Sequence, residues 1–340
     1  MNAASRFAAP SQNATPPSTG KGETDSPPAA ARRRFLAWAP AWLLTASACA
    51  SPPRVQAQAP AADGDYTPRR GQSGKDVIWV PTPDALTTRM LALASVKPSD
   101  YVVDLGSGDG KIVIAAAREF GARGLGIEFN PEMVALSERR AAAANVADRA
   151  KFQRGDIFAS DFSTATVVTM YLMPHLNLRL RHTLMALKPG TRIVSHEFRL
   201  GDWQPEESSS IGSQTAHLWI VPANAGGEWS LRFPSTGAGS GMLNASLWIE
   251  QSFQTFRGRA GFKDLQTTLR EPRLLGDQIS FGFTDPSGQP RQFVGRVGPQ
   301  RMEGRVTGGG RQGDFVAERV GNAPPINGST PVSQTEIYGG

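Results

Sequence analysis

The 340-residue chain has room for two ordinary domains, and its hydrophobic content of 39% is sufficient for folded cores. Its formal net charge of +6 suggests a nucleic-acid partner, but residues 1–75 carry nine Lys/Arg against four Asp/Glu, while residues 76–340 carry 27 against 26. The excess positive charge therefore lies ahead of the folded part, which argues against a nucleic-acid-binding face. The single cysteine, Cys49, excludes an intramolecular disulfide and a cysteine-based zinc site, and the four histidines lack the spacing of metal ligands.

The first 75 residues are expected to lie outside the folded domains. Residues 1–31 are rich in Ala, Ser, Thr, Pro and Gly, a composition that cannot bury a core. Arg32, Arg33 and Arg34 then precede an apolar run over residues 35–50, which resembles a twin-arginine export signal. We expect residues 1–50 to form a signal or anchor segment with a disordered leader, and the Pro/Gly-containing residues 51–75 to form a linker.

This leader predicts a location in the cell envelope or periplasm, with membrane association through the N-terminal segment. Two details stay open. Cys49 could carry a lipid, and cleavage could instead follow Ala50 or Ala59. If the leader is not functional, the chain would be cytoplasmic.

Residues 76–224 carry the alternating helix and strand patterns of an α/β domain, whose last predicted strand lies at 216–221. A helix is predicted to begin with a cap at Thr82 or Asp84 and to end before Pro98. Residues 101–110, Tyr-Val-Val-Asp-Leu-Gly-Ser-Gly-Asp-Gly, then predict a buried strand, a tight turn and the start of a helix.

The glycines of that turn indicate a ligand. Gly106, Gly108 and Gly110 allow positive φ and close approach, and the following helix N-terminus offers free N–H groups. Their spacing differs from the dinucleotide fingerprint G-x-G-x-x-G. The acid at the strand end, Asp104, fits a ligand with a positive amine better than it fits a pyrophosphate.

Acids also follow the next two predicted strands. The strand at 124–128 ends in Glu128, whose carboxylate can accept hydrogen bonds from both hydroxyls of a ribose. The strand at 150–154 is followed by Gly155, Asp156 and Ile157.

In this order, the motifs resemble those of the class I, Rossmann-like S-adenosylmethionine-dependent methyltransferases, whose first motif is similar to Asp-Leu-Gly-Ser-Gly-Asp-Gly at 104–110. The resemblance implies a doubly wound parallel sheet and S-adenosyl-L-methionine as cofactor. It also implies that Asp156 accepts from the adenine amino group and that Ile157 supplies a backbone contact. The cofactor-binding residues are then Asp104, Gly106, Ser107, Gly108, Gly110, Glu128, Asp156 and Ile157.

Further segments between residues 80 and 195 look most like bacterial relatives of the lysine methyltransferases that act on the ATP-synthase c-subunit. These segments are Val80-Pro81-Thr82-Pro83, Gly126–Pro131, Tyr171-Leu172-Met173-Pro174 and Lys188–Ser195. The resemblance implies an amine acceptor such as a protein lysine. Because Tyr-Leu-Met-Pro replaces the Asn/Asp-Pro-Pro-Tyr of enzymes that methylate adenine or glutamine amides, those acceptors are not favoured. A small-molecule methyltransferase and a catalytically inactive exported binding protein on the same fold remain the alternatives.

A lysine amine must be neutral to attack a methyl group, so its site should disfavour the ammonium or accept its proton. The titratable candidates expected near the methyl group are His175, His196 and Glu197, which follow the fourth strand and end the fifth. They could instead cap a helix or satisfy strand-end hydrogen bonds. Trp79, Tyr171 and Trp203 could form an aromatic wall around the acceptor, or simply core.

The pattern changes over residues 225–321, where apolar and polar residues alternate between Gly, Pro and Asp turns. This predicts an antiparallel all-β domain of about six or seven strands, a small barrel or sandwich. It could scaffold the enzyme, recognise a partner or bind an apolar ligand. Residues 322–340 are expected to be a disordered tail.

Overall fold

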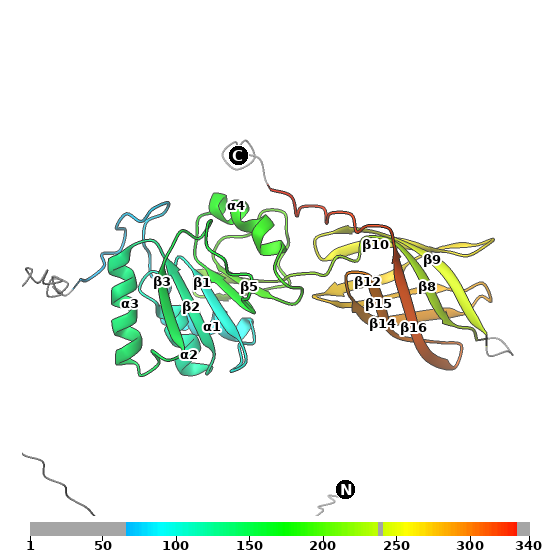
Figure 1. Cartoon of the computed structure of the whole chain (residues 1–340), viewed down its shortest axis with the longest axis horizontal. Helices are drawn as coiled ribbons and strands as arrows, with labels where there is room; N and C mark the ends of the chain where they lie inside the picture. Colours follow the sequence, from blue (N-terminus) through cyan, green and yellow to red (C-terminus); the bar gives the residue numbers. More distant parts are fainter. Residues whose placement is uncertain (1–65, 237–240, 332–340) are drawn as a thin grey trace, which may run out of the picture. The chain divides into compact units, whose positions relative to one another are not determined.

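The computed structural model describes residues 66–236 and 241–331 (Figure 1). The predicted signal or anchor segment at 1–50 lies outside the described residues, as do residues 51–65 of the predicted linker and residues 332–340. Within the described ranges, no helix is long and apolar enough to cross a membrane.

A seven-stranded mixed sheet organises the first domain, in the order β3-β2-β1-β4-β5-β7-β6. Its parallel strands are β1 (Tyr101–Leu105), β2 (Arg123–Glu128), β3 (Ala150–Arg154), β4 (Val167–Met170) and β5 (Arg192–His196). The chain winds outward from β1 to β3 and then returns to place β4 on the other side of β1. The carboxyl ends of β1 and β4 therefore form the crevice where doubly wound sheets bind ligands.

An antiparallel hairpin closes the other edge of this sheet. It consists of β6 (Glu207–Ile211) and β7 (Gln214–Ile220), and β7 pairs with β5. The sequence predicts only one strand here, at 216–221. The sequence Glu-Ser-Ser-Ser-Ile of β6 is largely polar because β6 is an edge strand with little burial.

Four helices cover the two faces of the sheet: α1 (Asp84–Leu93), α2 (Lys111–Glu119), α3 (Pro131–Ala143) and α4 (Pro174–Met185). The apolar side chains of α1 and α2 pack with Val102, Val167 and Val194 from one face. Helix α3 packs with α2 over the same side. The leucines of α4 pack with Val103, Val168 and Ile193 from the opposite face, so the sheet is covered on both sides.

The start of α1 differs from the sequence prediction. Its N-cap residue is Pro83, which makes no side-chain capping bond. The hydroxyl of Thr82 instead lies 3.1 Å from Nδ1 of His196 at the end of β5. The expected cap is thus used for a tertiary contact that joins the segment before α1 to the sheet.

The second domain is a nine-stranded antiparallel sheet in the order β11-β10-β9-β8-β16-β15-β14-β13-β12. It is barrel-like, because β10 also lies close to β12, and β11 close to β13. The strands are β8 (Gly227–Pro234), β9 (Met242–Ser252), β10 (Thr255–Gly261), β11 (Gln266–Thr268), β12 (Arg270–Leu275), β13 (Gln278–Thr284), β14 (Pro290–Val297), β15 (Arg301–Gly308) and β16 (Arg311–Val320). The expected antiparallel all-β domain is therefore present, with more strands than the sequence indicated.

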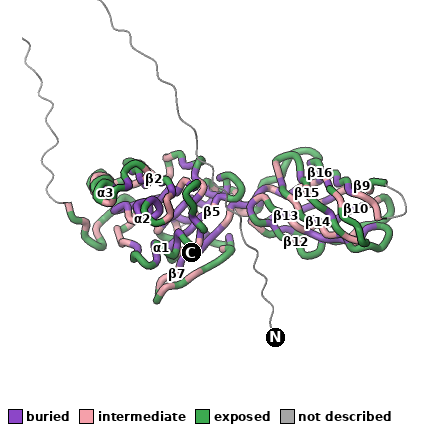
Figure 2. Tube along the Cα trace, turned by 90° about the horizontal axis from the view of Figure 1, so that it is seen from below, coloured by how far each residue is buried: buried purple, intermediate pink, exposed green. Residues whose placement is uncertain are grey.

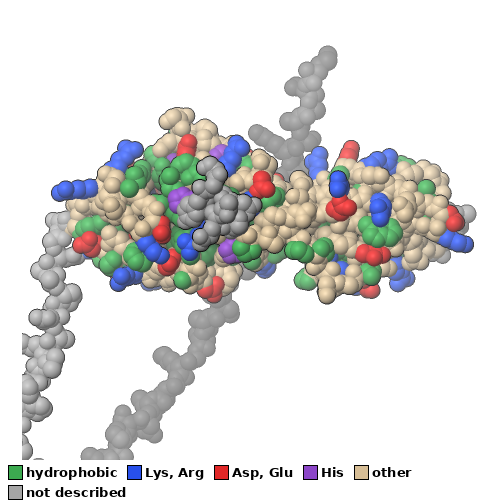
Figure 3. Space-filling model, turned by 90° about the horizontal axis from the view of Figure 1, so that it is seen from above, with side chains coloured by type: hydrophobic (Ala, Val, Ile, Leu, Met, Phe, Trp, Pro, Cys, Tyr) green, Lys and Arg blue, Asp and Glu red, His purple; other side chains and the backbone are tan. Residues whose placement is uncertain are grey.

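Stacked and edge-on phenylalanines, among them Phe233, Phe281 and Phe293, fill the inside of this sheet. Buried positions run along the centres of both sheets (Figure 2). On the face visible in Figure 3, cationic and anionic side chains are interspersed rather than gathered by sign, in keeping with the near balance of charge over residues 76–340.

Residues 322–331 correct the expectation of a disordered tail beginning at Asn322. Ile326 is 9% exposed and belongs to the apolar core that also contains Trp203 and Trp219. Asn327 forms a bridge with Ser252. An apolar side chain and a backbone pair thus hold this segment, although its composition resembles that of a linker.

Candidate cofactor and acceptor site

The glycine loop lies between β1 and α2 and forms one wall of a cavity at the carboxyl edge of the sheet. Gly106, Gly108 and Gly110 have φ of 76°, 52° and 79°, conformations that favour glycine. A Cβ atom on Gly108 would lie 2.5 Å from Nε1 of Trp79. The loop therefore needs glycine both for its backbone conformation and for the close approach of the Trp79 indole.

Asp104 lies beneath this loop and is buried. Its Oδ1 accepts a hydrogen bond of 2.7 Å from the hydroxyl of Thr169. Burial, with the nearby carboxylates of Asp109 and Glu128, raises the pKa of Asp104 to about 7, although the Thr169 hydrogen bond opposes the shift. A cationic ligand group beside Asp104 would stabilise the ionised form.

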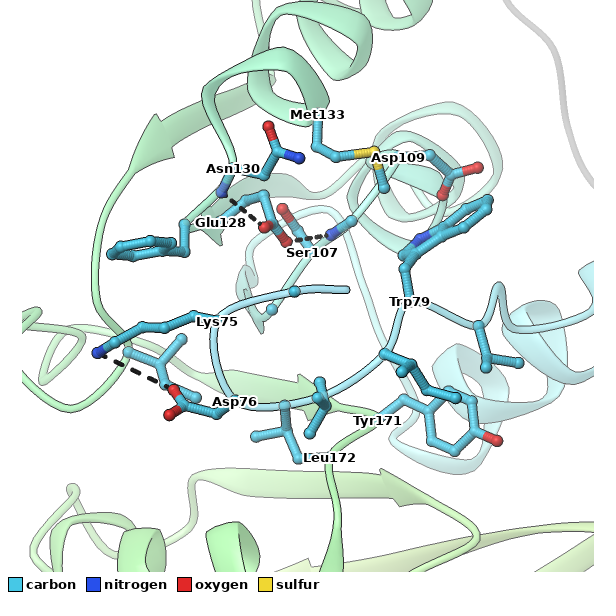
Figure 4. A pocket seen from close by; sticks show the side chains of 18 of the residues that line it. Lys75, Asp76, Trp79, Ser107, Asp109, Glu128, Asn130, Met133, Tyr171 and Leu172 are labelled. Atoms are coloured by element: carbon cyan, nitrogen blue, oxygen red, sulfur yellow. Dashed lines mark hydrogen bonds and ion pairs between the residues drawn. The ribbon is translucent and has the colours of Figure 1, made fainter. Parts of the chain in front are cut away.

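Glu128 ends β2 and lies next to the glycine loop. Its two carboxylate oxygens accept hydrogen bonds of 2.9 Å from the backbone N–H groups of Gly108 and Asn130 (Figure 4). The carboxylate therefore holds the glycine loop and the start of α3 together. Its remaining acceptor positions suit the predicted pair of ribose hydroxyls.

Asp156 and Ile157 follow β3 and line the same cavity. The Asp156 carboxylate accepts from the backbone N–H of Phe158 at 3.0 Å and from Nζ of Lys75 at 2.6 Å. The Lys75 hydrogen bond is the largest of the effects that hold the pKa of Asp156 below its ordinary value. One carboxylate oxygen of Asp156, the residue expected to accept a hydrogen bond from the adenine amino group, thus contacts the ammonium of Lys75.

Residues 72–78, ahead of the candidate Trp79, are the part of the site that sequence reasoning missed. Backbone hydrogen bonds of 2.8 and 2.9 Å join Gly71 to Trp79 and Trp79 to Gln72, and Ser73 bridges Ile78. We call this segment, residues 71–79, the N-terminal hairpin. Most of its residues line the cavity, where the sequence predicts a linker up to residue 75. Gly71 and Gly74 were the available signal for a turn.

The predicted catalytic residues lie beside the cavity rather than in its wall. The described lining contains neither His175, His196 nor Glu197. His196 is buried, Glu197 has a φ of 67° and accepts from the backbone N–H of Thr215, and His175 is the second residue of α4. Their catalytic role stays a prediction, and the geometry does not favour direct contact of any of the three with a ligand in the cavity.

The three aromatic candidates separate. Trp79 and Tyr171 line the cavity. Trp203 is fully buried in the core, where it stacks on Phe253 with ring centroids 5.9 Å apart. Trp203 is therefore core, and the proposed aromatic wall reduces to Trp79 and Tyr171.

The residues present fit S-adenosylmethionine. The hydroxyl of Ser107 is buried beside Gly126 of β2 and has no hydrogen-bond partner among the described residues. Glu128 and Asp104 provide acceptors for hydroxyl and cationic groups, and Ile112, Met133 and Leu172 provide apolar walls. When bound, this cofactor supplies an electrophilic methyl group on its sulfonium sulfur.

The match to known proteins covers this domain. The model of the ANTKMT methyltransferase domain family matches residues 104–207. A protein-lysine N-methyltransferase of Saccharolobus islandicus is 40% identical over 151 residues, which are 43% of this chain and 94% of the relative. The ATP-synthase c-subunit lysine N-methyltransferase of Mus musculus is 35% identical over 126 residues, 37% of this chain and 51% of that enzyme.

One solved structure also matches in sequence. An RNA methyltransferase from Salinibacter ruber in complex with S-adenosyl-L-homocysteine is 48% identical, with a TM-score of 0.41, and the match covers 42% of this chain and 94% of that one. The chain thus spans nearly the whole archaeal relative but about half of the mouse enzyme. It belongs to the family of class I S-adenosylmethionine-dependent methyltransferases that contains the archaeal protein-lysine N-methyltransferase.

Proposed function

We propose that this methyltransferase acts on the side-chain amine of lysine residues in a protein acceptor. The observation that carries the proposal is the 40% identity with the archaeal protein-lysine N-methyltransferase over 94% of that relative's length. The adenine nucleotide translocase lysine N-methyltransferase of Mus musculus, at 34% identity, adds support from a second lysine-directed relative.

The reaction requires orientation more than acid–base chemistry from the chain. The nitrogen lone pair forms the new N–C bond, the electrons of the broken C–S bond go to sulfur, and the proton of the methylated amine leaves to solvent. The described residues that line the cavity include no histidine. We expect the acceptor ammonium to lose its proton before attack, and the cavity wall then to exclude water around the neutral amine.

A labelled-methyl assay tests this function. The full chain is incubated with methyl-labelled S-adenosylmethionine and a synthetic polylysine peptide, and with the same peptide in which every lysine is acetylated. We expect label only on the free amines, and at a cofactor concentration near the wild-type Kd we expect several-fold less label from a Glu128→Ala variant. Label on neither peptide, in a protein that binds the cofactor by calorimetry, would contradict a lysine acceptor.

We also propose that the segment around Arg32 and Arg33 directs the chain to the cell envelope. The support is the twin-arginine-like order of basic and apolar residues. A fusion of residues 1–65 to a reporter that is active only outside the cytoplasm should be exported. Replacement of both arginines by lysine should abolish that export, and equal export of both fusions would contradict the proposal.

A further inference from the structure

A row of polar side chains crosses the carboxyl edge of the sheet on the face that α1 covers. Side chains alternate between the two faces of a strand. Val102 and Val167 pack under α1, so Asp104 and Thr169, two residues further along, share their face, as does Tyr171. On β5 the same relation places His196 beyond Val194. The row therefore runs from the acid under the glycine loop to Tyr171 and His196.

His196 is fixed at the end of this row. It is fully buried, and its Nδ1 lies 3.1 Å from the hydroxyl of Thr82. Its other ring nitrogen, Nε2, is buried without a hydrogen-bond partner among the described residues. Burial lowers the pKa of His196 to about 4, so the ring is neutral at pH 7. His196 thus offers a flat, uncharged and immobile surface rather than a proton acceptor in contact with solvent.

Tyr171 lies on that surface. The two ring centroids are 3.7 Å apart with an interplanar angle of 30°, and the ring of Phe198 follows at 6.3 Å. Stacking of this kind restricts the ring to one orientation. Thr82, which fixes His196, belongs to the segment that joins the N-terminal hairpin to α1. The orientation of Tyr171 is therefore linked to the position of that segment.

Tyr171 also lies at the end of the cavity where we expect an acceptor to bind. In Figure 4, Tyr171 is on the side of Trp79, away from Glu128 and Lys75. Three aromatic side chains line the described cavity: Trp79, Phe129 and Tyr171. Trp79 packs on Gly108, and Phe129 lies near Lys75 and Arg154. Tyr171 is the aromatic side chain left at the end opposite the expected ribose site.

We propose that Tyr171 is the residue that binds the acceptor amine, and that His196 and Thr82 are positioning residues that hold its ring. This inference rests on the proposed lysine acceptor. The ring face that His196 does not cover attracts an alkylammonium as it arrives, and the hydroxyl orients the amine by a hydrogen bond. Burial and the charge of Glu197 raise the pKa of Tyr171, so the phenol stays protonated and orients the amine without acting as its base.

Steady-state kinetics of the full chain test this role, with saturating cofactor and the polylysine peptide as acceptor. Tyr171→Leu removes the ring and Tyr171→Phe removes only the hydroxyl. We expect Tyr171→Leu to raise the acceptor KM at least about 10-fold and Tyr171→Phe to lower kcat/KM by about 3- to 10-fold. Cofactor affinity by calorimetry should stay within about 2-fold in both. Tyr101→Phe, a half-buried tyrosine at the amino end of β1, is the matched control and should leave all values unchanged.

The positioning role of His196 has its own readout. His196→Phe keeps a stacking ring but loses the contact with Thr82, whereas His196→Ala loses the ring. We expect His196→Phe to keep the acceptor KM within about 3-fold of wild type. His196→Ala should raise the acceptor KM as Tyr171→Leu does. If His196 had only a structural role, its substitution would lower stability and cofactor affinity, and the acceptor KM would not differ in this way between His196→Phe and His196→Ala.

The outcomes separate this inference from the proposed function. If the wild-type chain binds the cofactor but labels no amine, the lysine acceptor fails and this inference fails with it. If the wild type labels the peptide and Tyr171→Leu does so with unchanged KM and kcat, only the role of Tyr171 is overturned. Where Tyr171→Leu does not fold, Tyr171→Phe and His196→Phe decide, and wild-type kcat/KM in Tyr171→Phe overturns the role of the hydroxyl.

Discussion

Nζ of Lys75 lies 2.6 Å from Oδ2 of Asp156, and this ion pair fastens the tip of the N-terminal hairpin to the loop after β3. Both side chains are about one-third exposed. Surface pairs of this kind contribute little to global stability, typically about 0.2–1 kcal/mol. Because the pair joins two walls of the cofactor cavity, its effect should be seen in the exchange of the cofactor instead.

Replacing Lys75 by Met should therefore speed the release of S-adenosylhomocysteine by about 2- to 5-fold, the rate equivalent of such a pair. The free energy of unfolding should change by less than about 1 kcal/mol. A chase experiment in a stopped-flow instrument measures the rate. Lys188→Met, an exposed lysine before β5, is the matched control. A release rate equal to wild type would show that the hairpin is not held by this contact during exchange.

Glu128→Ala should weaken cofactor binding by at least about 10-fold. The substitution removes the predicted acceptor for the ribose hydroxyls and leaves the N–H groups of Gly108 and Asn130 without their 2.9 Å partners. Loss of the acceptor for groups that are shielded from water costs about 1–3 kcal/mol. Titration calorimetry measures the change. Glu132→Ala, in the first turn of α3 and exposed, should bind normally, and equal binding by both variants would remove Glu128 from the site.

The local parts of this site follow from the sequence. A strand, three glycines at alternate positions and a helix start occur within 20 residues, so local patterns suffice to predict the turn between β1 and α2. The acid at the end of β2 follows from the same alternation of strand and helix. These are the features from which the α/β fold and the methyltransferase family were predicted; the structure shows the fold and the comparisons confirm the family.

The missed parts depend on contacts between distant residues. Lys75 and Asp156 are 81 positions apart, and Thr82 and His196 are 114 apart, so neither pattern is visible locally. The expectation for His196 assumed that a strand-end histidine faces the cavity. Its stacking on Tyr171 and its burial under the segment before α1 could not be read from the sequence. The strand β11 is only three residues long, which is too short for an alternating pattern.

Cofactor affinity should depend on pH through Asp104, whose pKa burial raises to about 7. Below pH 7 the carboxyl is protonated and neutral, and above pH 7 it is an anion beside a cationic ligand. Affinity for S-adenosylmethionine should therefore rise between pH 6 and pH 7, below the range in which an α-amino group itself titrates, by about 5-fold at most. Calorimetry across this range measures it. In Asp104→Asn the affinity should be weaker and flat over the same range, and a pH slope that persists in this variant would assign the titration to another group.

The free energy of unfolding should depend on pH through His196, whose pKa is lowered in the folded chain whereas that of Asp104 is raised. Burial lowers its pKa from an ordinary value of 6.5 to about 4. The unfolded chain therefore takes up a proton as the pH falls through 6.5, while the folded chain resists until about 4. This contribution to the free energy of unfolding is present above pH 6.5 and is lost by pH 4, and it amounts to about 3 kcal/mol at most. Burial also lowers the pKa of His217, so both histidines act in the same direction.

Urea unfolding of wild type and His196→Phe between pH 4.5 and 7.5 isolates the part due to His196, because His217 is common to both proteins. The wild-type curve should fall more steeply than that of the variant as the pH decreases, and parallel curves would mean that His196 is protonated equally in the folded and unfolded chains.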